Sequence, residues 1–187
     1  MRRTRGNLSY ALLELMVEKG YDAITIQDLL DRANVGRTTF YDHYRDKDDL
    51  LVEGLKNLRS FLREHQRAAI ARTGPLRDRA LGFSLAMFEH AGEQRALFRA
   101  IVGRRAGTIV MQHVRRMFQE LVRDDLAALG VRGTEVPVEA IVEFAVGSLM
   151  SILMWWADLR SNVPDAAHAD AMFRRLTIPG ILAAVGR

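Results

Sequence analysis

The chain has 187 residues, of which 49% are hydrophobic and 27% charged, so it can form one compact domain or a small module joined to a larger one. It has no cysteine, which excludes disulfide scaffolds, thiolate zinc sites, iron–sulfur clusters and cysteine nucleophiles. The net charge is +4, but residues 1–50 hold 8 Lys or Arg against 9 Asp or Glu, so a nucleic-acid partner for this segment must be argued from where the charges lie.

Apolar residues recur at spacings of three and four along the chain, and this period predicts an all-α protein. The first helix should end at Lys19-Gly20, where a cation in the last turn precedes a glycine that can adopt the left-handed cap conformation. Its buried face is formed by Leu8, Leu12, Leu15 and Met16.

Two short helices should follow. Thr25 is expected to cap the first of them, with Asp28 completing a capping box, and the helix should end near Asn34, which tolerates a positive φ. The second runs from about Arg37 to Tyr44. Asp46 then caps a long fourth helix.

The later part of the chain is expected to contain longer helices, for a total of about nine, with breaks at Gly- and Pro-containing segments, Gly103 among them. The longest uncharged stretch, residues 144–157, is shorter than the ~20 residues of a membrane-spanning helix and is interpreted as part of a buried core helix. Pro179 predicts a kink or a restart in the last helix. The expected ranges are 47–71, 76–92, 94–102, 106–129, 137–159 and 166–185.

Residues 25–44 have the pattern of a helix-turn-helix. Phe40 and Tyr44 lie four residues apart, on one face, and suit inward packing, while Arg37, Thr38, Tyr41 and His43 point elsewhere and could donate to base edges and phosphates.

Charge placement favours the same interpretation. Arg2, Arg3 and Arg5 are expected to form a basic arm, and Arg37, His43 and Lys47 to cluster at the recognition end. The acids Glu14, Glu18, Asp22 and Asp31 are expected on the far side.

Residues 3–51 resemble the DNA-binding domain of the TetR (tetracycline-repressor) family of bacterial regulators. The resemblance lies in the ordered spacing of residues 20–26, 34–44 and 46–51, although the family commonly has Gly at the position of Asn34, Tyr at His43 and Phe at Tyr44. It implies a three-helix helix-turn-helix domain over residues 1–50 and a larger helical effector-binding and dimerisation domain over residues 51–187. The residues it implies for DNA contact are Gln27, Arg37, Thr38, Thr39, Tyr41, His43 and Lys47.

The resemblance also implies a function. The chain would be a ligand-responsive transcriptional regulator, most often a repressor, that binds a pseudo-palindromic operator in double-stranded DNA as a homodimer and is released by a small-molecule effector. It would act in the cytoplasm at the nucleoid, with no membrane partner. Segment 138–157 and the last helix would form the dimer interface. The side chains suited to an effector pocket are Phe83, Met87, Phe98, Met111, Met150, Met154 and Trp155.

An enzyme is the rival class, and the common catalytic and phosphate-binding motifs are missing from the sequence. No catalytic residue, metal ligand or cofactor is therefore expected. A further alternative is a helical dimer that binds a ligand or a partner protein without sequence-specific DNA binding.

Overall fold

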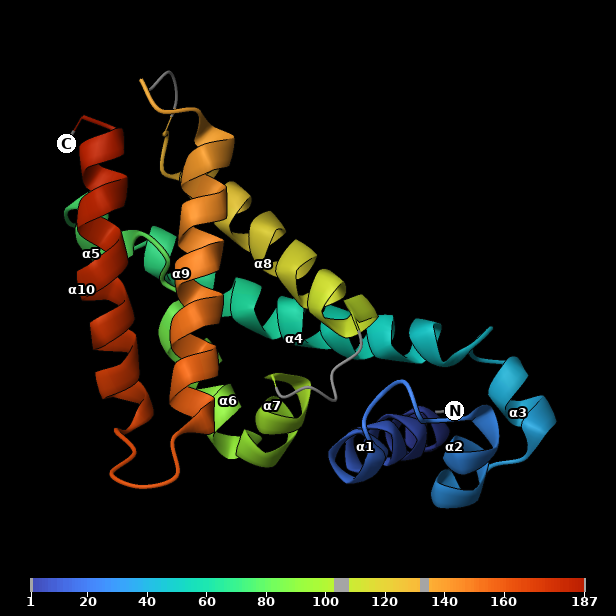
Figure 1. Cartoon of the computed structure of the whole chain (residues 1–187). Helices are drawn as coiled ribbons and strands as arrows, with labels where there is room; N and C mark the ends of the chain where they lie inside the picture. The colour runs from blue at the N-terminus through green and yellow to red at the C-terminus, as the bar shows by residue number, and fades with distance from the viewer. Residues whose placement is uncertain (1, 103–107, 132–134, 187) are drawn as a thin grey trace. The chain divides into compact units, whose positions relative to one another are not determined.

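A computed structural model describes residues 2–102, 108–131 and 135–186. All regular structure in these ranges is α-helix, which confirms the predicted all-α class (Figure 1). The helices are α1 (Arg2–Lys19), α2 (Ile26–Ala33), α3 (Arg37–Tyr41), α4 (Lys47–Ile70), α5 (Leu76–Arg79), α6 (Ser84–Glu93), α7 (Arg95–Val102), α8 (Thr108–Ala128), α9 (Val138–Asp158) and α10 (Ala166–Ala184).

The chain divides into two compact units. The first combines Met1–Leu58 with Ala96–Val114, and the second combines Arg59–Arg95 with Arg115–Arg187. Helices α4 and α8 each contribute residues to both units. The expected domain boundary between residues 50 and 51 stays a prediction, because the first unit also takes in a segment far along the chain.

The first unit is built on the apolar face of α1, which lies beside α2. The four residues predicted for this face are all buried, and they pack in one cluster with Leu29, Leu30 and Ala33 of α2. Helix α1 ends where predicted, since Gly20 follows it with a φ of 79°.

The second unit contains the predicted core helix. Helix α9 contacts α6 and α10, and the ring centroid of Phe88 lies 5.7 Å from that of Trp156 and 6.1 Å from that of Phe173. By length and composition α9 could cross a membrane, but half of its most apolar window is buried among the other helices, as in the core helix of a globular domain.

Residues 76–92, expected to form one helix, form two. The chain turns at Leu81, which has a φ of 55° although it is not glycine. The backbone N–H of Leu81 donates to the buried carboxylate of Asp125 at 2.8 Å, and Arg174 donates to the carbonyl of Ala80 at 2.9 Å. These long-range hydrogen bonds offset the backbone strain at Leu81. They could not be predicted from the local sequence, because their partners lie far along the chain.

Three local expectations also differ from the structure. Helix α3 ends at Tyr41 instead of Tyr44, because the N–H groups of His43 and Tyr44 both bond to the carbonyl of Phe40 in a closing turn.

Helix α10 continues through Pro179 without a restart; Pro179 is exposed, so the carbonyl it leaves unbonded can face water. The expected basic arm is the first turn of α1. The predicted break at Gly103 lies outside the described residues.

Candidate nucleic-acid interface

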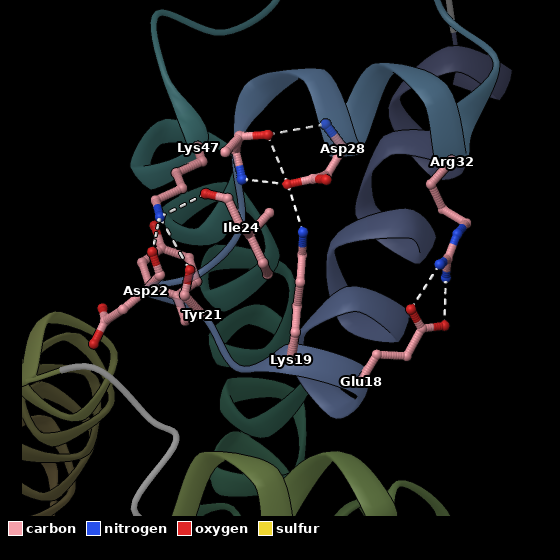
Figure 2. Close-up of polar contacts among 9 residues, drawn as sticks. Glu18, Lys19, Tyr21, Asp22, Ile24, Asp28, Arg32 and Lys47 are labelled. Carbon is pink, nitrogen blue, oxygen red and sulfur yellow. Dashed lines mark hydrogen bonds and ion pairs between the residues drawn. The ribbon is translucent and has the colours of Figure 1, made fainter.

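The start of α2 is fixed by the predicted capping box. The hydroxyl of Thr25 accepts from the backbone N–H of Asp28 at 3.2 Å, and the carboxylate of Asp28 accepts from the backbone N–H of Thr25 at 2.7 Å. Lys19, at the end of α1, lies 2.6 Å from the same carboxylate (Figure 2). The ammonium of Lys19, together with Thr25, lowers the pKa of Asp28 well below its usual range.

The turn between α2 and α3 depends on Asn34, which has a φ of 51° and a ψ of 54°. The N–H of Val35 donates to the carbonyl of Leu30 at 3.0 Å, so the turn closes the end of α2. Asparagine adopts this left-handed conformation at low cost, as predicted. The turn sets the direction in which α3 leaves.

Helix α3 has an apolar back and a polar front. Phe40 and Tyr44 are buried, with ring centroids 5.9 Å apart. Arg37, Thr38 and Tyr41 are exposed, Tyr41 to 51%. This orientation agrees with the sequence prediction, and Arg37, Thr38 and Tyr41 are called the α3 surface below. Its charged and hydroxyl groups are donors of the kind that bind phosphates and base edges.

Two consecutive side-chain hydrogen bonds connect Arg37 to α2. Its guanidinium donates to the side-chain oxygen of Gln27 at 3.0 Å, and the amide nitrogen of Gln27 donates to the carboxylate of Asp31 at 2.8 Å. A carboxylate can only accept, so Asp31 turns the amide nitrogen of Gln27 toward itself and leaves the oxygen for Arg37. Asp31 was expected on the far side of the domain, and this expectation is wrong, because one turn of helix brings it beside Gln27.

The remaining candidate residues are less exposed. Thr39 and His43 are half-buried, and the ring of His43 lies 6.3 Å from that of Tyr44. Lys47 is also half-buried, and its ammonium lies 2.9 Å from the carbonyl oxygen of Ile24 and 3.0 Å from that of Tyr21. Phosphate contact by these residues stays a prediction.

Two acidic side chains of α1 share one cation of α2. Arg32 of α2 reaches back to Glu18 at 2.7 Å (Figure 2) and to Glu14 at 3.3 Å. The hydrogen bonds from Arg32 lower the pKa of Glu18. The pairing offsets these two carboxylates locally and leaves the net charge of residues 1–50 unchanged.

The residues expected to line an effector pocket divide between the two units. Phe98 and Met111 belong to the first unit, and the others belong to the second. Phe83 and Met87 are fully buried, Met150 and Met154 are half-buried, and Trp155 is 48% exposed. Trp155 therefore lies on an outer side of α9, and the pocket stays a prediction.

Sequence reasoning missed two polar features of the site. The Gln27–Asp31 pair could have been found, since residues four apart on a helix are neighbours. The contacts of Lys47 could not, because they join residues 23 to 26 positions apart through backbone oxygens that every sequence possesses.

Comparison with known proteins identifies the N-terminal segment. Residues 10–53 match the family model described as bacterial regulatory proteins, tetR family. Over 50 residues the chain is 48% identical to YxbF, an HTH-type transcriptional regulator of Bacillus subtilis (strain 168). That match covers 26% of this chain and 13% of YxbF, so the likeness is confined to the helix-turn-helix region.

The fold of the whole chain is similar to solved regulators. A putative TetR-family regulator from Syntrophomonas wolfei superimposes with a TM-score of 0.77 at 19% identity, covering 98% of this chain and 96% of the other. FadR of Thermus thermophilus, a TetR-family repressor solved with lauroyl-CoA, superimposes with a TM-score of 0.65 at 20% identity over 95% of each chain. At these identities the likeness establishes the fold.

Proposed function

We propose that this chain, whose residues 10–53 match the family model for bacterial regulatory proteins of the tetR family, is a ligand-responsive transcriptional regulator and not an enzyme. It binds a pseudo-palindromic operator in double-stranded DNA as a homodimer, acts most often as a repressor, and is released by a small molecule. It works in the cytoplasm, at the nucleoid.

The α3 surface is the observation that carries this proposal. Arg37, Thr38 and Tyr41 are exposed on a helix whose back is anchored by buried Phe40 and Tyr44. An exposed helix of this kind fits a major groove, where Arg37 can donate two hydrogen bonds to a guanine. Gln27 and Thr38 are further base-contact candidates, while Thr39, Tyr41 and His43 are phosphate-contact candidates.

An exposed apolar face supports the homodimer. Phe144 and Trp155 on α9 are each 48% exposed, and Leu176 on α10 is 67% exposed. The ring of Phe144 lies 3.2 Å from the position that a Cβ on Gly180 would occupy, so α9 and α10 present this face together. Two helices from each subunit would form a four-helix interface that buries these side chains.

A small-molecule effector is proposed because the fold is one that can hold such a molecule, as in the lauroyl-CoA complex of the Thermus thermophilus protein. Differential affinity of the effector for two conformations would shift the equilibrium away from the DNA-binding one. Helix α4 is the proposed lever, since it starts at the helix-turn-helix and contributes residues to both units.

Selection of duplexes from a random DNA pool tests the proposal directly. The purified protein should enrich pseudo-palindromic sites, and its affinity should fall steeply with salt. Arg37→Ala should weaken binding to the selected site about tenfold or more. Arg72→Ala, which removes the same charge from an exposed position after α4, should leave that affinity close to wild type. Failure to enrich any duplex would favour a helical dimer that binds only ligands or proteins.

A further inference from the structure

Lys47, the first residue of α4, directs its ammonium at the turn between α1 and α2. The nitrogen lies 2.9 Å from the carbonyl oxygen of Ile24, 3.0 Å from that of Tyr21 and 3.5 Å from that of Asp22 (Figure 2). A lysine ammonium has three N–H donors and no acceptor, so three carbonyls occupy its full hydrogen-bonding capacity.

Tyr21 contacts α4 through its ring and its hydroxyl as well as through its carbonyl oxygen. The Lys47 nitrogen also lies 4.6 Å from the centroid of the Tyr21 ring, and this ring is buried. The Tyr21 hydroxyl in turn donates to the carboxylate of Asp48, the next residue of α4. Two successive residues of α4 are thus bonded to a turn that precedes them by more than 20 residues.

The turn bonded by Lys47 leads into the start of α2. The N–H of Ile24 donates back to the carbonyl of Tyr21 at 3.1 Å, and the next residue is Thr25, the N-cap of α2. A displacement of this turn would displace the start of α2, and with it Gln27, which holds Arg37.

We propose that Lys47 is a positioning residue, not a phosphate contact: it clamps the turn of residues 21–24 to the first turn of α4 and so fixes the start of α2 relative to α4. The role rests on the proposed function, in which α2 and α3 present the DNA-binding side chains and α4 is the lever. The clamp is then the point at which a movement of α4 reaches Gln27 and Arg37.

Substitution by arginine separates the clamp from a phosphate contact. Both a guanidinium and an ammonium can bind a phosphate. The N–H donors of a guanidinium lie in one plane, however, so they do not match three carbonyl oxygens that surround a single nitrogen. Lys47→Arg should therefore preserve a phosphate contact and break a clamp. Lys47→Met keeps most of the stem and removes the charge, so it breaks both.

Hydrogen exchange without DNA tests the clamp by itself. Exchange at the amides of residues 20–25 should be about tenfold faster in Lys47→Arg and Lys47→Met, since lost hydrogen bonds to a charged group open the turn. Lys56→Met is the matched control, because Lys56 lies on the same helix, is 59% exposed at its side chain and pairs only at 3.6 Å with Glu53. Wild-type exchange in Lys47→Arg would overturn the proposal.

Salt dependence of DNA binding gives the second measurement, with a short generic duplex as the probe. For a clamp, Lys47→Met and Lys47→Arg should both weaken binding while the slope of log affinity against log salt stays unchanged. For a phosphate contact, Lys47→Met should reduce the slope by about one and Lys47→Arg should keep it. That second pattern would also overturn the proposal.

The two proposals can fail separately. If the wild-type protein binds no duplex, the proposed function fails, while the exchange experiment still decides whether Lys47 clamps the turn. If Lys47→Met does not fold, the outcome supports the clamp, because loss of a solvent-facing phosphate contact does not unfold a domain. Lys47→Arg then carries both measurements.

Discussion

Asp31 illustrates how one residue can control the direction of another that is proposed to bind DNA. Its carboxylate orients the amide of Gln27, and Gln27 holds Arg37. We predict that Asp31→Ala frees the amide to rotate and lets Arg37 sample several directions. The preference for a selected duplex over a scrambled duplex of the same composition should fall about tenfold, which is the scale of one lost bidentate base contact.

The salt slope distinguishes this effect from a general loss of binding. Asp31 neutralises no phosphate, so the slope should be unchanged, and the removal of a negative charge should if anything strengthen non-specific binding. Glu64→Ala, at an exposed position on α4, controls for the charge change. An unaltered preference ratio in Asp31→Ala would show that Arg37 is not oriented through Gln27.

At this scale the sequence predicted apolar positions better than polar partners. Phe40 and Tyr44 are buried as expected, because a spacing of four on a helix determines which side chains share a face. The direction of Asp31 and Lys47 depends on bonds to a neighbouring side chain and to distant backbone oxygens, and hydrophobic periodicity carries no information about either.

The start of α2 shows how a single element responds to pH. The pKa of Asp28 is lower in the folded state than its ordinary value of 3.8, mainly through Lys19 and then through Thr25. Its stabilising effect is therefore fully present above that ordinary value and is lost as the pH falls through the folded pKa. The difference in unfolding free energy between wild type and Asp28→Asn should shrink as the pH is lowered from about 6 to about 3.

Thermal or urea unfolding of both proteins at each pH measures this difference. Asp22→Asn is a suitable control, since Asp22 is an exposed acid in the preceding turn and does not cap α2. A wild-type advantage that grew on acidification would contradict the assignment of Asp28 as an ionised cap.

Two glycines on neighbouring elements are predicted to respond oppositely to alanine. At Gly82 a Cβ would lie 2.0 Å from the Cβ of Ala69 on α4, so Gly82→Ala should destabilise the protein by about 2 kcal/mol through overpacking. At Gly54, inside α4, a Cβ would meet nothing within 4 Å, so Gly54→Ala should stabilise it by about 1 kcal/mol through helix propensity.

Chemical unfolding of the two variants checks both signs, and each variant is the control for the other. Equal effects would mean that the turn after α5 does not approach α4 closely. The pair also shows why the turn escaped prediction: Gly82 permits a close approach to a residue 13 positions earlier, whereas residues 76–92 alone have the periodicity of one helix.

On the scale of the whole molecule, α4 is the element through which the proposed regulation would act. One end of α4 carries Lys47 and Asp48, which bond to the turn before α2, and its other half carries Arg59 and Arg63, which pair with Glu120 and Asp124 of α8. Polar contacts fasten each half of α4 within its own unit. In the proposed mechanism, a change in either unit would act on this one helix.

The proposed homodimer gives the last prediction, which rests on the exposed apolar face of α9 and α10. Leu176→Glu places a charge on that face, where burial without a partner is strongly unfavourable, so the protein should sediment as a monomer. A monomer can engage only one half-site, and the affinity for the full operator should fall about a hundredfold or more while that for a half-site is retained.

Tyr10→Glu is the matched control, because Tyr10 of α1 is 65% exposed, close to the 67% of Leu176, and lies in the other unit. Two results would contradict this prediction: a Leu176→Glu protein that stays dimeric, or one that loses half-site and full-site binding equally. Either would show that the α9–α10 face does not form the dimer that binds the operator.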